Sequence, residues 1–313
     1  MPAQDILLQL DTLPTANQLR PFSEPTEIAL SLTGSDETPI ENGWVQIRVD
    51  APKPGRFFST DFPFVEGTRL LEVRLPIRRG KVEWQYLFPI RGQYRIVAEA
   101  TTIDGRKANK SFDIKVKERE RKWLFLGLFT LGLFSSGFIA GRVFTPLHMR
   151  SKQKLMLGVF LSFLGLISRN EKAFTQEPTA EKYAGRFEIN IATVGKLSRI
   201  RWHIGGAEAE TRPVNLTLKI THLEKGKTVF AVEKVPVTRE FSMNFQFTDG
   251  ADYRLEAVAY VDNGESIRSE RTVTAIGIEP PAGAAIPVLS FFLIVIASGL
   301  WAGRWSRRAT APS

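Results

Sequence analysis

The stretch that decides the fold occurs twice in the chain. VEWQYLFPIRGQYRIVAEATTIDG, residues 82–105, overlays FSMNFQFTDGADYRLEAVAYVDNG, residues 241–264, without a gap and at an offset of 159 residues. A match of this length at a fixed offset indicates a duplicated structural unit. Its identical pairs include Tyr94 with Tyr253, Arg95 with Arg254, Ala98 with Ala257 and Gly105 with Gly264.

The match extends to both sides of this stretch. Upstream, at the same offset, TEIALSLT (26–33) overlays GRFEINIA (185–192), so we predict that these two segments are equivalent strands. Downstream, after a small shift, SGFIAGR (136–142) matches SGLWAGR (298–304). The repeated unit is therefore predicted to be a β domain followed by its own apolar helix.

Alternation of apolar and polar residues dominates both domains. In QYRIVAEA, residues 93–100, Tyr94, Ile96 and Ala98 fall on one face of a predicted strand. Short segments of this kind, bounded by Gly, Pro, Asp and Asn, are typical of antiparallel sandwiches. We expect a mainly β fold of two tandem sandwiches, residues 1–117 and 175–279. Each is followed by a transmembrane helix, and a third short helix lies between them.

One strand of each domain has a recognisable pattern. GQYRI (92–96) and ADYRL (251–255) resemble the penultimate strand of the immunoglobulin and fibronectin type III superfamily, with its tyrosine corner. The resemblance implies that the phenol of Tyr94 and that of Tyr253 bond a nearby backbone group. The second residue after each tyrosine, Cys in antibody domains, is Ile or Leu here, which places both copies with the cysteine-free branches. The resemblance implies a fold and no activity.

Three uncharged stretches predict membrane helices. The nineteen residues after Lys122 predict a helix at 123–142, which approaches the roughly 30 Å of a hydrocarbon core. A second long stretch predicts the last span at 284–303. Residues 155–168 number only fourteen, a length that fits either a short span or a re-entrant segment.

Charges at the helix ends predict the orientation. Lys and Arg gather in 143–154 and 304–313, which indicates a cytoplasmic loop and a cytoplasmic tail. A duplicated unit should insert the same way round twice, which requires 155–168 to span. Both β domains are then predicted on the extracytoplasmic side of the cytoplasmic membrane. The predicted interface anchors are Lys122, Trp123, Arg142, Trp301, Arg304 and Trp305.

The first residues favour a second topology. MPAQDILLQLDTL contains neither a basic region nor a continuous apolar stretch, so no signal peptide is visible. Either the true start lies upstream, or the first domain stays inside. In the second case 155–168 does not span and only the second domain is exported. The repeat and the charge pattern favour the arrangement with both domains outside.

Composition excludes several classes of site. The 313 residues include no cysteine, which removes disulfides, thiolate zinc sites, iron–sulfur clusters and cysteine nucleophiles. The three histidines have no metal-binding spacing, and no GxSxG or GxGxxG motif occurs. We expect no enzyme activity, no cofactor and no metal. Weak calcium candidates lie in two neighbouring turns, where tight turns need the same residue types: Asp249, Asp252, Asp262 and Glu265.

Two groups of residues are candidates for protein contacts. Aromatic density in GRFFSTDFPFVEG predicts either an exposed partner surface or core packing, for Phe57, Phe58, Phe62 and Phe64. Small residues four apart let helix backbones approach, within this chain or between chains, at Gly137, Gly141, Gly299 and Gly303.

These features predict a non-enzymatic integral membrane protein that presents two extracytoplasmic immunoglobulin-like domains. Its expected role is a scaffold or accessory subunit for a protein partner. The alternative is a membrane-anchored module that binds Ca²⁺ or a small solute. The net charge of +9 does not predict a nucleic-acid partner, because the basic run 115–122 adjoins the first helix and suits lipid headgroups. The bilayer is therefore an expected partner, together with a protein or a second copy.

Overall fold

The computed structural model describes residues 6–55, 59–118, 120–143, 185–205, 213–260, 266–278 and 282–309. It contains two compact units. The first, which we call the β body, is formed by residues 1–119 and 179–284. The second contains the two long helices, which we call the helix pair. Most of the predicted loop 143–154, the predicted short helix 155–168 and the start of the predicted second domain, 175–184, lie outside the described residues.

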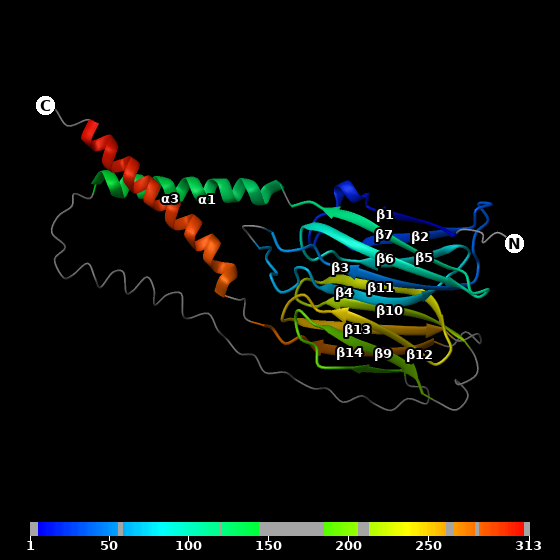
Figure 1. Cartoon of the computed structure of the whole chain (residues 1–313). Coiled ribbons are helices and arrows are strands. Elements are labelled where there is room, and N and C mark those ends of the chain that lie inside the picture. Colours follow the sequence, from blue (N-terminus) through cyan, green and yellow to red (C-terminus); the bar gives the residue numbers. More distant parts are fainter. Residues whose placement is uncertain are drawn as a thin grey trace. The chain divides into compact units, whose positions relative to one another are not determined.

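Among the described residues, each repeat forms seven strands (Figure 1). The first repeat comprises β1 (Leu7–Leu13), the short 3₁₀ helix η1 (Ala16–Gln18), β2 (Thr26–Thr33), β3 (Gly43–Asp50), β4 (Arg69–Pro76), β5 (Lys81–Tyr86), β6 (Gly92–Thr102) and β7 (Lys107–Val116). The second comprises β8 (Gly185–Ile189), β9 (Leu197–Ile204), β10 (Val214–His222), β11 (Lys227–Val237), β12 (Glu240–Gln246), β13 (Asp252–Tyr260) and β14 (Ser266–Thr274).

The strands form two antiparallel sheets that each contain both repeats. One sheet has the order β1-β2-β5-β11-β10-β13-β14, and the other β7-β6-β3-β4-β12-β9-β8. The two predicted tandem sandwiches are therefore joined, because the strands of both repeats lie in the same two sheets. Period-two alternation shows which side chains are buried but not which strand edges pair, because an edge is defined by backbone groups that every residue carries.

The two joints between the repeats are equivalent. In the β5–β11 joint Tyr86 faces Phe230, and in the β4–β12 joint Leu71 faces Phe245. At the offset of 159 residues, Tyr86 corresponds to Phe245 and Leu71 corresponds to Phe230. Each repeat thus uses the same two edges to hold the other, as in a two-fold symmetric dimer.

One predicted equivalence is wrong. GRFEI forms β8, which pairs with β9 at the sheet edge as β1 pairs with β2. The counterpart of TEIALSLT is β9, because β9 pairs with β12 as β2 pairs with β5. The offset changes along the chain because residues 51–68 between β3 and β4 are replaced by the four-residue turn 223–226 between β10 and β11. Apolar and polar residues alternate in the same way in every strand, so the sequence match paired β2 with β8 instead of with the adjacent strand β9.

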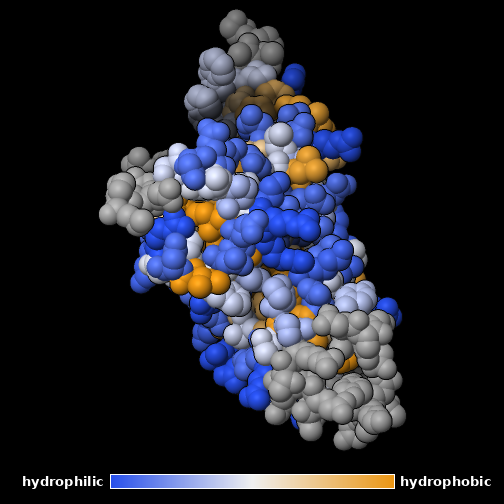
Figure 2. All heavy atoms as spheres, turned by 90° about the vertical axis from the view of Figure 1, so that its right-hand side faces the viewer, coloured by the Kyte–Doolittle hydropathy of each residue, from blue (hydrophilic) through white to orange (hydrophobic). Residues whose placement is uncertain are grey.

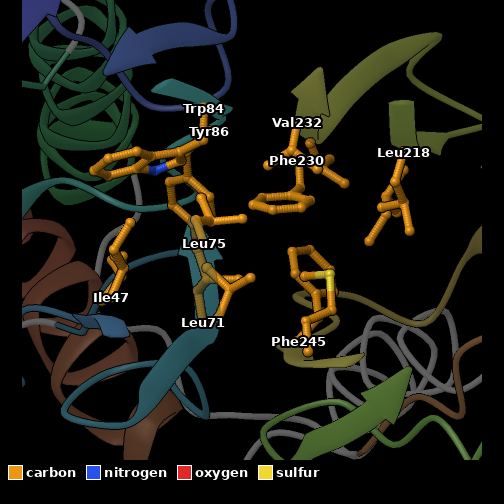
Figure 3. Close-up of a cluster of buried hydrophobic side chains, with 14 of the residues drawn as sticks. Ile47, Leu71, Leu75, Trp84, Tyr86, Leu218, Phe230, Val232 and Phe245 are labelled. Carbon is orange, nitrogen blue, oxygen red and sulfur yellow. The ribbon is translucent and has the colours of Figure 1, made fainter. Parts of the chain in front are cut away.

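The core of the β body is continuous across the joints. The inward side chains of both sheets form one cluster of buried residues from both repeats. Figure 3 shows Leu71 and Tyr86 of the first repeat beside Phe230 and Phe245 of the second, and Phe230 is completely buried. Burial of this much apolar surface favours one cooperative body over two independent ones.

Both long helices qualify as membrane spans by length and composition. They are α1 (Glu120–Val143), with mean hydropathy 1.8, and α3 (Ala282–Ala309), whose segment Ile286–Arg307 has mean hydropathy 2.1. Each extends beyond its predicted bounds, and α3 takes in part of the predicted tail 304–313. Lys and Arg favour helix as well, so a helix can continue past the end of its apolar stretch. The apolar stretch therefore predicts where the membrane span lies but not where the helix ends.

Candidate functional site

The last strand of each repeat runs toward the same end of the β body, which we call the proximal end. The antiparallel order places the ends of β5, β7 and β14 together. α1 follows β7, and α3 follows β14. The candidate site residues described below are on the loops of this end and on the helix pair.

The proximal end of the first repeat contains a tyrosine corner. The Tyr94 hydroxyl donates to the carbonyl oxygen of Ile90 at 2.7 Å and accepts from its backbone nitrogen at 2.9 Å. Both groups are buried, and burial raises the pKa of the phenol well above its ordinary value. These are the backbone bonds that the resemblance implied for Tyr94.

The second repeat replaces this corner with a polar cluster. Tyr253 donates to the carboxylate of Asp249, whereas Tyr94 donates to a backbone carbonyl oxygen. The completely buried His222 places Nε2 at 3.0 and 3.1 Å from the two carboxylate oxygens, and Lys225 forms an ion pair with the same carboxylate. In the first repeat the register puts Ala51 at the position of His222.

The Asp249 carboxylate is held ionised by its neighbours. Burial alone would raise its pKa, but hydrogen bonds from His222, Lys225 and Tyr253 outweigh burial and hold the pKa well below the ordinary value of 3.8. Burial, reinforced by the Asp249 charge, raises the pKa of Tyr253. Sequence reasoning missed this cluster because its members come from different strands and turns. The available signal was an Asp four residues before Tyr253, where Ile90 precedes Tyr94.

The structure describes Asp249 and Asp252, two of the four calcium candidates. The Asp249 oxygens accept from protein donors, and Asp252 accepts from the Thr274 hydroxyl at 2.5 Å. Asp262 and Glu265 lie outside the described residues. In the part of the chain that the structure describes, no group of three or more His, Cys, Asp or Glu residues could hold a metal ion.

The described phenylalanines of the aromatic loop pack within the β body. Phe62 and Phe64 are half-buried against the core, whereas Phe57 and Phe58 lie outside the described residues. The Phe62 ring lies 5.3 Å from that of Phe22, and the ammonium of Lys225 is 4.1 Å from the Phe22 ring centroid. The same ammonium lies 5.4 Å from the Phe62 ring centroid, which links the aromatic loop of the first repeat to the polar cluster of the second.

The four glycines meet where α1 and α3 contact each other. A Cβ on Gly137 would lie 2.6 Å from the Ile296 carbonyl oxygen. A Cβ on any of the others would collide with a backbone oxygen: Gly141 with Leu300, Gly299 with Phe134 and Gly303 with Phe138. The contacts advance together along both helices, so the helices are parallel, and only glycine permits their close approach.

The predicted interface anchors are exposed on the helix pair. Trp123 is 60% exposed, Trp301 71% and Trp305 68%. The Trp301 and Trp305 rings stack, with centroids 6.3 Å apart and planes within 5°. Lys122, Arg142 and Arg304 are also exposed. Exposed aromatic and basic side chains at the ends of apolar helices are typical of membrane interfaces.

The β body is mostly hydrophilic on the face at the right of Figure 1. Figure 2 shows this face with hydrophilic side chains predominating and hydrophobic ones in small, separate patches. Trp44, 41% exposed, lies in the second sheet beneath the guanidinium of Arg74, whose central carbon is 5.0 Å from the ring centroid. Such a surface suits contact with water.

Comparisons with known proteins give no family for this chain. No family model matches it, and no curated protein matches it. Three similar solved structures are a tetra-tandem repeat from the extending region of a large adhesion protein (11% identity, TM-score 0.23), a red sea bream transglutaminase (6%, 0.23) and a Ca²⁺-stabilized adhesin with which an Antarctic bacterium binds ice (10%, 0.21). They match 87%, 87% and 88% of this chain, which spans 49%, 31% and 49% of theirs.

Proposed function

We propose that this chain is a non-enzymatic integral membrane protein that presents its β body outside the cytoplasmic membrane as a scaffold or accessory subunit for a protein partner. One observation carries the proposal. Both repeats contribute strands to both sheets, and each repeat leads into an apolar helix from the same end of the shared body. A body attached twice by helices at one end is suited to hold a rigid surface at a membrane.

The shared sheets bear on the sidedness of the chain. Strands that pair directly cannot lie on opposite sides of a bilayer, so both repeats belong to one compartment. If α1 crosses the membrane, the chain must cross again before Gly185. The stretch proposed for this second crossing, 155–168, lies outside the described residues. The β5–β11 and β4–β12 joints therefore support the arrangement with both repeats on one side over the arrangement with only the second repeat exported.

An immunoglobulin-like fold for each repeat is part of the proposal. Two features support it: the division of each repeat into three strands of one sheet and four of the other, and the backbone bonds of Tyr94. The second repeat retains the tyrosine position but bonds a side chain there. Sandwiches of this kind serve many unrelated functions, so the fold supports a binding role without naming the partner.

The helix pair supports double anchoring within one chain. The four glycines are used in the contact between α1 and α3, which favours packing inside the chain over self-association through these faces. The outward-facing apolar side chains of both helices are available to lipid, since only 11% of each predicted span is buried.

Protease protection on sealed vesicles tests the proposal. A cleavage site after Asp104, in the β6–β7 turn, and another after Asn263 mark the two repeats. We expect both to be cut only from the extracytoplasmic side, while a site after Ala309 is cut only from the cytoplasmic side. Cleavage at Asp104 and Asn263 from opposite sides, or of both from the cytoplasm, would contradict the proposal. Cross-linking of intact cells should then recover a partner only through the extracytoplasmic surface.

A further inference from the structure

A basic hollow of about 1100 Å³ opens at the proximal end of the first repeat. The β3–β4 loop, the start of β6 and the end of β7 form its walls. Six basic and three acidic side chains line it, which leaves an excess of three positive charges. The basic residues are Lys53, Arg69, Arg91, Arg95, Lys115 and Lys117.

The arginines of this hollow are neutralised and the lysines are not. Arg69 pairs with Asp50 at 3.1 Å, Arg91 with Glu118 at 2.6 Å and Arg95 with Asp113 at 3.7 Å. These pairs use all three acidic residues of the lining. Among the described residues, no ion pair engages the lysines, and all three are exposed: Lys53, Lys115 and Lys117.

The fold itself does not require these lysines. β14 is the counterpart of β7, and its register puts Thr274 at the position of Lys115 and Ile276 at that of Lys117. The second repeat forms the same strands with a neutral and an apolar residue there. The lysines are therefore specific to the first repeat, and an anion bound among them would offset their mutual repulsion.

The position of the hollow indicates which anion. Glu118, which lines the hollow, precedes the first residue of α1 by two positions, and the apolar part of α1 begins at Trp123. A spanning α1 brings this part of the chain to the level of the phospholipid headgroups, where an exposed lysine attracts the phosphate of an anionic lipid. We infer that the hollow binds the headgroup of an anionic phospholipid, with its phosphate facing Lys53, Lys115 and Lys117. This inference rests on the proposed function.

Short-chain lipids added to the full chain in mild detergent test the site. Binding of dihexanoyl phosphatidylglycerol is compared with that of dihexanoyl phosphatidylcholine and of inorganic phosphate. The test variant combines Lys53→Gln, Lys115→Gln and Lys117→Gln. The matched control removes three exposed lysines elsewhere on the β body, Lys81, Lys107 and Lys219, by the same substitution. A thermal melt of each variant verifies that it is folded.

We expect saturable binding of phosphatidylglycerol that weakens by about tenfold to a hundredfold in the test variant, and with added salt, but not in the control. Three results would overturn the site: equal binding by both variants, equal binding of phosphatidylcholine, or binding of inorganic phosphate as tight as that of phosphatidylglycerol. Absence of saturable binding would do the same. Alkaline carbonate extraction separates the two proposals, because release of the chain from membranes would overturn the anchoring itself.

Discussion

Asp249 is the residue at which the second repeat departs most clearly from the first. Its carboxylate accepts from His222, Lys225 and Tyr253 at once, whereas Ile90 offers only backbone groups to Tyr94. A buried histidine that loses its charged partner retains the cost of desolvation without the compensating bond. The stability of the proximal end of the second repeat therefore depends on one carboxylate.

Asp249→Asn should destabilise the β body by about 1–3 kcal/mol, because the amide cannot accept from all three donors. Urea unfolding of the purified chain, followed by tryptophan fluorescence, measures the change. The matched control is Asp113→Asn, which removes only the exposed 3.7 Å pair with Arg95 and should alter stability by less than about 0.5 kcal/mol. Equal effects of the two substitutions would contradict a structural role for the cluster.

The lowered pKa of the Asp249 carboxylate should make the stability of the β body depend on pH. The pKa of Asp249 is lower in the folded protein than its ordinary value of 3.8, so its stabilising contribution is complete above that value and is lost as pH falls through the folded pKa. Unfolding midpoints measured from pH 7 down to pH 2 should decline less steeply in Asp249→Asn than in the unsubstituted chain. Parallel curves below about pH 4 would refute the assignment.

Some of these residues could be predicted from the sequence and others could not. The role of Tyr94 followed from a local pattern, because its partner Ile90 is four residues away. The pairing of His222 with Asp249 depends on how β10 and the turn before β13 meet, which no local pattern specifies. Alternation in DYRLEAVAY, residues 252–260, predicted correctly that Tyr253 is buried but not what its hydroxyl bonds.

At the scale of the elements, two different sequence features predict the existence of α1 and α3 and the way they pack together. Their existence follows from long uncharged stretches, and their mutual packing follows from glycines at matching depths. The repeated SGxxAGR motif predicted close approach of helices but left open whether the partner helix is in the same chain. The structure brings Gly137 beside Gly299 within one chain, so the motif and its duplicate are complementary.

Alanine at Gly137 and Gly141 should separate the helices, because even a methyl group would meet the backbone of α3. The control, Gly127→Ala with Gly132→Ala, has open space at both positions and should be neutral or slightly stabilising, since alanine favours helix. Spin labels on cysteines introduced at Val143 and Trp305, in a chain with no native cysteine, measure the distance between the helices. A broadened distribution is expected only in the first variant, and identical distributions would contradict the glycine contact.

At the scale of the whole molecule, the two repeats are halves of one folding unit. Phe230 belongs to the second repeat, is completely buried and pairs with Tyr86 of the first. Phe230→Ala should lower the free energy of unfolding by about 3–5 kcal/mol. It should also lower the protection of backbone amides from hydrogen exchange throughout the β body. Hydrogen exchange of peptides from β6, in the other repeat, provides the readout. Loss of protection confined to the second repeat would mean that the repeats are independent.

The duplication was visible in the sequence because strand patterns survive divergence, whereas the joints were not. β4 and β12 alternate as any half-buried strands do, and nothing in that pattern distinguishes an edge that pairs with the other repeat from one that faces water. The outward-facing Glu72 and Asn244 mark the β4–β12 joint, since the Asn244 amide donates to the Glu72 carboxylate at 3.2 Å. Such a pair is recognisable only once the register is known.

The central claim is that the sheets are continuous across the repeats, and one cross-link tests it. Glu72 and Asn244 face each other across the β4–β12 joint, and the chain has no other cysteine to compete with a pair introduced there. We predict that Glu72→Cys with Asn244→Cys forms a disulfide in membranes, so that fragments cut at a protease site placed within 169–178 stay joined until reduced. The control pair, Glu72→Cys with Glu256→Cys, should form no disulfide, because Glu256 lies in the other sheet. Fragments of the first variant that separate without reductant would contradict the shared sheets.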